Sequence, residues 1–330
     1  MSIPKKRSAF KRFLVLLVAV IGCALAWAFL LRPGMDQVAA HRYPDPTPKQ
    51  LVAPALYATW FGTTGVLLSD GVHAVMVDPF FTRPPGFINM LANQPIAPNE
   101  ALIKHWLDSA GVKKLDAVMV SHSHYDHAMD AGIVAKLTDA PLLGSSSTAF
   151  IGRGNGLPVT QLRVVKPGQE MKYGPFTITF IRSKHAGATG GTPTGDISEP
   201  LVPPARYLDY RQGGTYAILV QHPRGSVLLN GSAGFSPGEL QGHKADVVFL
   251  GIAIRGDMQD YLRETVDAVG ATRVIPTHWD DFTLPLDEPL KPFPVGIRLN
   301  AFFDDMAKLR PAIKVQTLEP GRRVVLFPQE

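Results

Sequence analysis

Short apolar runs separated by turn residues dominate the chain from residue 56 onward. Apolar stretches occupy 56–61, 66–68 and 74–77, and Ser69-Asp70-Gly71 separates the last two. Runs of this length bounded by glycine, serine and aspartate are typical of β-strands, and the Ser-Asp-Gly sequence favours a hairpin turn. The pattern predicts that the folded body opens with three strands, the second and third joined as a hairpin.

The rest of the body mixes strand patterns with amphipathic segments. Helices are predicted over 98–111, 129–138 and 257–269, the last of which ends at Gly270. The later strands are all predicted from short apolar runs, at 115–120, 161–165, 176–182, 215–221, 226–230, 246–251, 272–276 and 323–327. Clusters of strands followed by helices, with hairpins in place of strict alternation, favour an α/β (α+β) fold with two mixed sheets packed face to face.

The richest chemical pattern is the sequence His-Ser-His-Tyr-Asp-His at 122–127, directly after the predicted strand 115–120. Residues two apart at a strand end point the same way, so His122 and His124 can reach one cation together. Asp126 and His127 can then face a second cation nearby. Imidazole and carboxylate ligands suit zinc, iron or manganese. The alternative is a polar surface loop, which the spacing and the preceding strand disfavour.

An uncharged apolar segment, Phe13–Leu31, precedes the body and follows a cluster of five basic residues. Nineteen helical residues span roughly 28 Å, close to the hydrocarbon thickness of a bilayer. We therefore expect a transmembrane helix. Basic flanks remain in the cytoplasm, which predicts that the remaining ~300 residues lie outside it, on the periplasmic side of a bacterial inner membrane.

Two alternatives for this segment remain open. A signal peptide could be cleaved after Ala24-Leu25-Ala26 or Ala26-Trp27-Ala28, and Val20-Ile21-Gly22-Cys23 resembles a lipoprotein signal with lipid attached at Cys23. All three possibilities export the body. The expected organisation is a basic tail and apolar helix over 1–32, a proline-containing tether over 33–55 and a catalytic domain over 56–330.

Charge and cysteine content narrow the function. The net charge is +5, but five of the 33 basic residues precede the apolar segment, which leaves 28 basic against 28 acidic residues from position 13 onward. A neutral body does not indicate nucleic-acid binding. The single cysteine, Cys23, excludes an intramolecular disulfide framework and a cysteine-rich zinc site in the body. The expected partners are a small-molecule or lipid substrate and the membrane.

The chain resembles the metallo-β-lactamase superfamily, which carries an H-x-H-x-D-H signature at a strand end. Within it, Thr59-Trp60-Phe61-Gly62, Asp78-Pro79-Phe80-Phe81 and Pro276-Thr277-His278-Trp279 are similar to one branch. That branch holds the N-acylphosphatidylethanolamine-hydrolysing phospholipase D and the ascorbate-6-phosphate lactonase. The resemblance covers residues 56–327 and implies a four-layer αβ/βα sandwich.

The resemblance also implies a ligand set. His122 and His124 would bind a first metal, and Asp126 and His127 a second. His185, after the predicted strand 176–182, would complete the first site. His278, after 272–276, would join the second. The implied cofactor is one or two zinc ions, with iron or manganese as alternatives.

The sequence departs from the family at two positions. Ser232 stands where relatives place an aspartate that bridges the two metals, and Thr63 stands where relatives of the branch often carry a histidine. A hydroxyl contributes no charge to offset two cations about 4 Å apart. The second metal is therefore expected to bind weakly unless Asn230 or a water substitutes. A catalytically impaired binding protein is the alternative to an enzyme.

The implied reaction is hydrolysis by a metal-activated water, oriented and deprotonated by Asp126. The bond could belong to an ester, a lactone or a phosphodiester, possibly in a lipid, and β-lactams fit the branch motifs least. Two segments could wall the site: an apolar flap over 82–99 and a loop over 190–214 that carries Arg206, Tyr207, Tyr210 and Arg211. Ordinary surface loops are the alternative for both.

Overall fold

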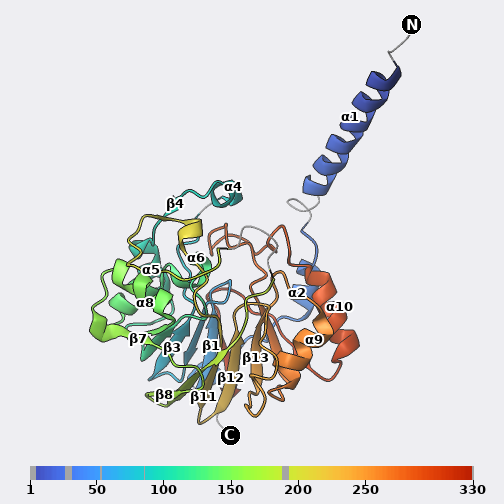
Figure 1. Ribbon diagram of the computed structural model, residues 1–330. Helices are drawn as coiled ribbons and strands as arrows, with labels where there is room; N and C mark the ends of the chain where they lie inside the picture. Colours follow the sequence, from blue (N-terminus) through green and yellow to red (C-terminus); the bar gives the residue numbers. More distant parts are fainter. Residues whose placement is uncertain (1–4, 27–31, 53, 85, 188–192, 329–330) are drawn as a thin grey trace.

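Two seven-stranded sheets stack face to face with helices on both outer sides in the computed structural model (Figure 1). The structure describes the chain except residues 1–4, 27–31, 53, 85, 188–192 and 329–330. This arrangement confirms the predicted sandwich of two mixed sheets. It arises because nearly every strand carries apolar side chains on the face that meets the other sheet.

The first sheet joins both ends of the body. Its order is β16 (Arg323–Pro328), β1 (Ala55–Trp60), β2 (Val66–Ser69), β3 (Ala74–Val77), β5 (Ala117–Met119), β6 (Leu142–Gly144) and β7 (Leu162–Val164). Pairing is antiparallel from β16 to β3 and parallel from β3 to β7. The C-terminal ends of β3 and β5 therefore lie at the same edge of the sheet.

The second sheet has the order β15 (Lys314–Val315), β14 (Arg273–Thr277), β13 (Val247–Gly251), β12 (Gly225–Asn230), β11 (Tyr216–His222), β9 (Phe176–Arg182) and β8 (Glu170–Tyr173). Strands β12 to β15 are parallel, and β11 is antiparallel to both β9 and β12. The C-terminal ends of β9, β12, β13 and β14 consequently share one edge. A separate two-stranded sheet pairs β4 (Pro95–Ile96) with β10 (Ala205–Arg206).

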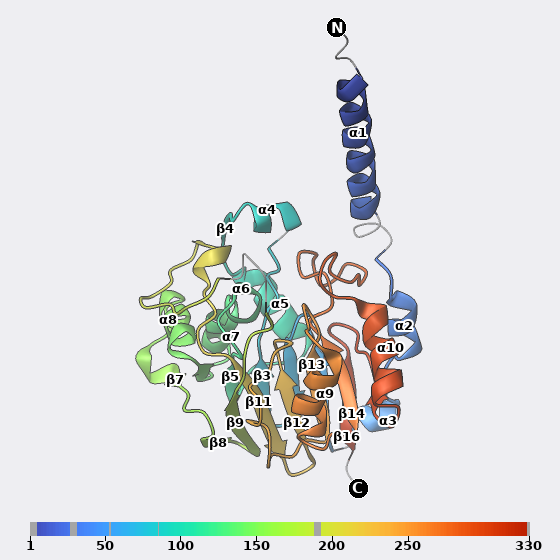
Figure 2. The same ribbon diagram turned by 45° about the vertical axis from the view of Figure 1, so that its right-hand side comes forward.

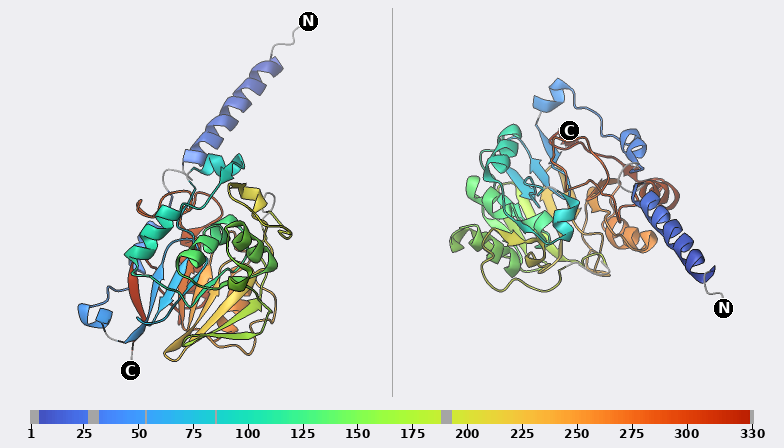
Figure 3. Two further views of the ribbon diagram at one scale, coloured as in Figure 1. Left: turned by 90° about the vertical axis from the view of Figure 1, so that its left-hand side faces the viewer. Right: turned by 90° about the horizontal axis from the view of Figure 1, so that it is seen from above.

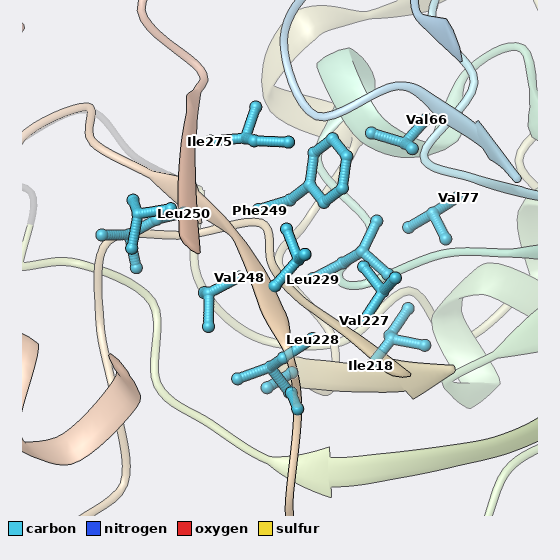
Figure 4. Packing of buried hydrophobic residues seen from close by; sticks show 14 of the residues in the cluster. Val66, Val77, Ile218, Val227, Leu228, Leu229, Val248, Phe249, Leu250 and Ile275 are labelled. Carbon is cyan, nitrogen blue, oxygen red and sulfur yellow. The ribbon is translucent and has the colours of Figure 1, made fainter. Parts of the chain in front are cut away.

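The main core fills the space between the sheets. Figure 4 shows Val66 and Val77 of the first sheet beside Leu229, Phe249 and other apolar residues of the second. All four of these side chains are at most 3% exposed. Burying one such side chain stabilises the fold by about 1.5–3 kcal/mol, so this layer is the main attraction between the sheets.

Helices cover the outer faces (Figures 1 and 2). The first sheet is covered by α5 (Glu100–Ser109), α7 (Ala131–Leu137) and α8 (Ser146–Gly154), and the second by α9 (Met258–Leu262), its π-helical continuation Arg263–Asp267, and α10 (Leu299–Leu309). Asn99 caps α5 by accepting a hydrogen bond from Leu102 N at 3.1 Å. The predicted helices are confirmed. The shorter helical segments are α2 (Met35–Ala40), α3 (Pro48–Val52), α4 (Phe87–Leu91), α6 (Tyr125–Ala128), η2 (Val159–Gln161) and η3 (Tyr207–Asp209).

Helix α1 (Lys5–Ala26) projects away from the body in every view (Figure 3). It contains the basic cluster and residues 13–26 of the predicted membrane segment; residues 27–31 of that segment lie outside the described residues. Within the described part of the chain, no helix combines the length and apolar character needed to cross a membrane.

The segment 33–55 differs from the extended tether that its prolines predict. It contains α2 and α3, and the side chains of Val38 and Tyr43 are buried in the main core. Tyr43 N donates to Thr317 O at 2.8 Å, and Thr317 Oγ1 donates to Val38 O at 2.7 Å. These contacts attach the segment to the body, where α2 lies beside α10 (Figure 2).

Candidate metal centre

The candidate ligands all follow strands that end at the same edge of the sandwich. His122 and its neighbours follow β5, His185 follows β9, Ser232 follows β12 and His278 follows β14. Because these strands are parallel within their sheets, their ends bring residues distant in sequence together. The structure groups the six predicted ligands into two sets, His122 with His124 and His185, and Asp126 with His127 and His278.

The second set has the spacing of atoms that share one ion. His127 Nε2 lies 3.3 Å from His278 Nε2, and Asp126 Oδ2 lies 3.2 Å from His278 Nε2 and 3.6 Å from His127 Nε2. Two ligand atoms bound tetrahedrally to zinc at about 2.0–2.1 Å lie roughly 3.3 Å apart. The three atoms therefore fit one face of a metal's coordination shell.

In the first set, each imidazole has one nitrogen available for a metal. His124 Nε2 lies 3.0 Å from Pro193 O and His185 Nδ1 lies 2.8 Å from Ala186 O, so each donates an N–H to a carbonyl and keeps its other nitrogen free. His122 Nε2 is buried and has no hydrogen-bond partner among the described residues. An unpaired nitrogen at this depth fits a metal ligand, since a buried polar atom without a partner is costly.

The protonation states of the two sets differ. Burial lowers the pKa of His122 far below its usual value, lowers that of His124 to about 4, and lowers that of His185. Burial alone would lower the pKa of His127, but the negative charges of Asp126 and Asp78 outweigh burial and raise this pKa above its usual value. The first set is therefore composed of neutral imidazoles at neutral pH, which is the form that binds metals.

Asp126 stays ionised in this environment. Burial alone would raise its pKa, but the charge of His127, together with the hydrogen bond and charge of His278, lowers it below its usual value. Its side chain is 9% exposed at the floor of a cavity. A carboxylate in this state can accept a proton from a bound water.

Asp78 is a functional residue that the sequence pattern marked only as part of a family motif. It is fully buried and accepts hydrogen bonds from four donors: Ser121 N at 2.7 Å, Ser121 Oγ at 2.6 Å, Thr64 Oγ1 at 2.8 Å and His127 Nδ1 at 2.9 Å. The bond to Nδ1 leaves His127 Nε2 facing Asp126 and His278. One feature of the sequence could have pointed to this role: Asp78 directly follows β3, and the end of β3 lies beside the end of β5.

Two strained turns hold His278. Its φ is 55° and that of Thr63 is 45°, both in the left-handed region that residues other than glycine seldom occupy. His278 N donates to Thr63 O at 2.7 Å, and Thr63 N donates to Asp280 Oδ1 at 2.8 Å. Asp280 in turn forms a buried ion pair with Arg83 at 2.5 Å. The backbone of Thr63 thus positions His278, although the Thr63 side chain does not replace the histidine that the resemblance led us to expect.

Ser232, where the resemblance led us to expect an aspartate, makes a structural contact. Its Oγ accepts a hydrogen bond from Ala186 N at 2.8 Å, next to His185. Asn230 as a substitute ligand stays a prediction; its Nδ2 donates to Ser232 O, Gly234 O and Tyr261 Oη within 2.7–3.0 Å, and its Oδ1 accepts a hydrogen bond from Ser183 Oγ at 3.4 Å. Asn230 shapes the loop, and Ser232 fastens it to the His185 segment.

A cavity of about 830 Å³ opens over the two sets. The apolar flap contributes Met90 and Leu91 to its wall, and the second predicted loop contributes Tyr207. That loop also contributes Pro193 and Leu208, whereas Tyr210 is fully buried in the core beneath the first sheet's helices, and Arg206 and Arg211 are exposed and do not line the cavity.

Histidine and carboxylate side chains set at strand ends below an open cavity define a metal-dependent hydrolase of the αβ/βα sandwich type. The chain belongs to the metallo-β-lactamase superfamily, whose family model matches residues 58–278. The resemblance drawn from the motifs is thereby confirmed.

Known relatives agree with this class. The chain is 26% identical over 261 residues to the probable L-ascorbate-6-phosphate lactonase UlaG of Escherichia coli O127:H6, covering 70% of this chain and 72% of that protein. It is 22% identical over 234 residues to a UPF0173 metal-dependent hydrolase of Pyrobaculum islandicum, covering 70% of this chain and 87% of the relative. Both fit the branch that the motifs indicate.

Solved structures share the fold. A possible metal-dependent hydrolase from Veillonella parvula aligns with a TM-score of 0.52 at 14% identity, over 83% of this chain and all of the other. Igni18, a metallo hydrolase from Ignicoccus hospitalis, aligns with a TM-score of 0.50 at 17% identity, over 82% of this chain and 97% of the other. At these identities the likeness concerns the fold alone.

Proposed function

We propose that this hydrolase cleaves a carboxylic ester or a lactone with a metal-activated water. The observation that carries metal-assisted hydrolysis is the ionised, cavity-facing Asp126, 3.2 Å from His278 Nε2 and beside the three neutral imidazoles of the first set, and the relative named as a lactonase supports the choice of an ester or lactone. A bound cation supplies two things here, a water with a pKa lowered to roughly 7 and polarisation of the carbonyl oxygen. We propose His122, His124 and His185 as its principal ligands, with Asp126, His127 and His278 for a second ion.

The chain's own residues complete the reaction. Asp126 orients the water and takes its proton as the water oxygen bonds to the acyl carbon. The bond from acyl carbon to ester oxygen then breaks, and the leaving alkoxide takes up the proton that Asp126 received. The products are a carboxylate and an alcohol, or a hydroxy acid from a lactone. The low pKa of Asp126 favours this return of the proton.

We propose zinc as the metal, with iron and manganese as the alternatives that the same ligands accept. Imidazole and carboxylate donors without a thiolate suit all three ions.

We also propose that the apolar N-terminal segment attaches the body to a membrane, with the catalytic domain outside the cytoplasm. Support comes from the basic cluster before Phe13 and from the exposure of apolar side chains along α1, including Phe13 at 60% and Val15 at 70%. A reporter joined after residue 40 should be active outside the cytoplasm and sediment with membranes; a soluble cytoplasmic reporter contradicts this. Loss of the anchor in Cys23→Ala would indicate a lipoprotein.

The hydrolase proposal is tested with the zinc-loaded body and a panel of esters, lactones and phosphodiesters. Turnover of esters or lactones is expected, and Asp126→Asn should lower kcat by about 10²–10⁴ while the protein remains folded. Turnover of phosphodiesters alone contradicts the choice of bond. Ligand binding without any turnover would favour the second candidate, a catalytically impaired binding protein. That candidate is supported by Ser232, whose neutral side chain adds no charge to the second metal site.

A further inference from the structure

The walls of the cavity carry no cationic side chain among the described residues. Away from the candidate metal ligands, its lining is mainly aromatic and aliphatic, with Met90, Tyr125, Phe282, Phe293 and Ile297 among its residues. Phe282 and Phe293 stack with ring centroids 4.5 Å apart and an interplanar angle of 4°. A volume of about 830 Å³ is in the range of small-molecule sites.

The arginines next to the lining residues are directed elsewhere. Arg255 follows Ile254 in the wall, but its guanidinium donates to Ile297 O at 2.6 Å and Arg298 O at 2.9 Å. Arg298 donates to Arg255 O at 3.1 Å, and Arg206 is exposed outside the cavity. None of the three therefore supplies a charge to a group bound within these walls.

The mouth of the cavity is apolar as well. Leu91, Leu208, Ile254 and Val295 line the cavity and are 69%, 46%, 39% and 50% exposed. They come from four separate segments: α4, η3, the loop after β13 and the loop before α10. Large apolar residues this exposed are uncommon as a group, and their convergence on one opening indicates an apolar ligand.

We infer that the substrate carries an uncharged apolar tail that lies in this cavity, and no anionic group remote from the bond that is cleaved. The inference rests on the proposed ester or lactone hydrolysis and names its substrate class. A carboxylate or phosphate placed against these walls would lose its hydration and find no cationic partner. The relative named as an ascorbate-6-phosphate lactonase acts, by that name, on a lactone that bears a phosphate. The cavity described here lacks the side chains to hold such a group.

A homologous series of p-nitrophenyl esters, acetate to octanoate, tests the inference with the zinc-loaded full chain. The value of kcat/KM should rise by about fourfold for each methylene that enters the cavity. An ester of the same length that ends in a carboxylate should be at least 10²-fold poorer than its uncharged counterpart. A flat or falling series, or a preference for the charged ester, overturns the inference while leaving ester hydrolysis in place.

If no ester is turned over, the proposed reaction is refuted. The preference for an apolar ligand can then still be tested with a pair of ligands that are not cleaved. Calorimetry should show that N-octylacetamide binds at least tenfold more tightly than 7-acetamidoheptanoate. Equal affinities, or tighter binding of the anion, would overturn the inference.

Matched variants localise the effect. Leu208→Lys places a charge at the half-exposed mouth and should reduce the preference for the uncharged ligand by about tenfold or more. Val72→Lys adds the same charge at a residue that is 88% exposed and does not line the cavity, so it should leave the preference unchanged. Equal behaviour of the two variants would place the apolar ligand outside this cavity and refute the assignment.

Discussion

The two histidine sets lie against each other, with the rings of His122 and His127 3.9 Å apart, yet they are built on different principles. The first set is three imidazoles that burial keeps neutral, two of them fixed by main-chain carbonyls. The second set contains a carboxylate, and its His127 has a raised pKa. Protons compete little with a metal for the first set, whose pKa values are lowered, and more strongly for the second, because Asp126 and Asp78 raise the pKa of His127.

Ser232 sharpens this contrast. Its hydroxyl brings no negative charge to the second set, and the hydrogen bond that it accepts from Ala186 N holds the segment beside His185, a ligand of the first set. Ser232 therefore supports the first set and adds no charge to the second. We expect two sites of unequal affinity, with the first ion held more tightly.

The largest effect is expected from removing the first set. His122→Ala combined with His124→Ala should abolish tight metal binding and lower hydrolysis by more than the roughly 100-fold that loss of a supporting partner costs. Element analysis and turnover measure the result, with His105→Ala, an exposed histidine outside both sets, as the control. Wild-type protein that purifies without metal and keeps its thermal stability after chelation would contradict the account.

Asp78→Asn tests how the second set is supported. The substitution keeps the shape, and asparagine tolerates the φ of 44° at this position. It removes the charge that orients His127, so affinity for the second ion should fall by about 10- to 100-fold while the first is kept. Asp116→Asn is the matched control, because Asp116 pairs with His73 at 3.1 Å in a partly exposed site outside both sets. Equal loss of both ions in Asp78→Asn would show that the two sets are not independent.

Smaller changes in metal binding are expected from two substitutions of Ser232, one that strengthens the second site and one that weakens the first. Ser232→Asp should raise metal content toward two ions per chain, because the added carboxylate offsets repulsion between the cations. Ser232→Ala removes the acceptor for Ala186 N, which should destabilise the fold by about 1–3 kcal/mol through the unpaired amide and weaken the first site by loosening His185. Metal titrations of both variants check this. If wild type already binds two ions equally tightly, Ser232 is not limiting.

Local patterns predicted most of this molecule, and long-range contacts account for what they missed. The strand before His122 and the period-two spacing of His122 and His124 were visible in sequence, as were β9 and β14, which carry His185 and His278 to the same edge. Asp78 was harder to assign, because its role depends on the parallel pairing of β3 with β5 and on His127, 49 residues away.

The errors have the same origin. Prolines between 33 and 55 predicted a tether, but the burial of Val38 and Tyr43 against the body decides the conformation there. The 190–214 loop was predicted to wall the site with Arg206, Tyr207, Tyr210 and Arg211, but a loop's composition does not show which side chains face a cavity. Here Tyr207 faces it and Arg206 and Arg211 do not.

The central claim, that two unequal metal sites arise from the different protonation of the two sets, is tested most directly by acid release of bound metal. Zinc-loaded protein is titrated downward from pH 8 while free zinc is recorded with a chelating dye. A raised pKa lets protons displace a metal at higher pH, and a lowered pKa delays displacement. The ion held by the second set should therefore leave at the higher pH, because the pKa of His127 is raised, and the ion held by the first set should leave at a lower pH, because the pKa values of its three imidazoles are lowered. Release of both ions in a single step, or no release of zinc anywhere in the titration, would contradict the account.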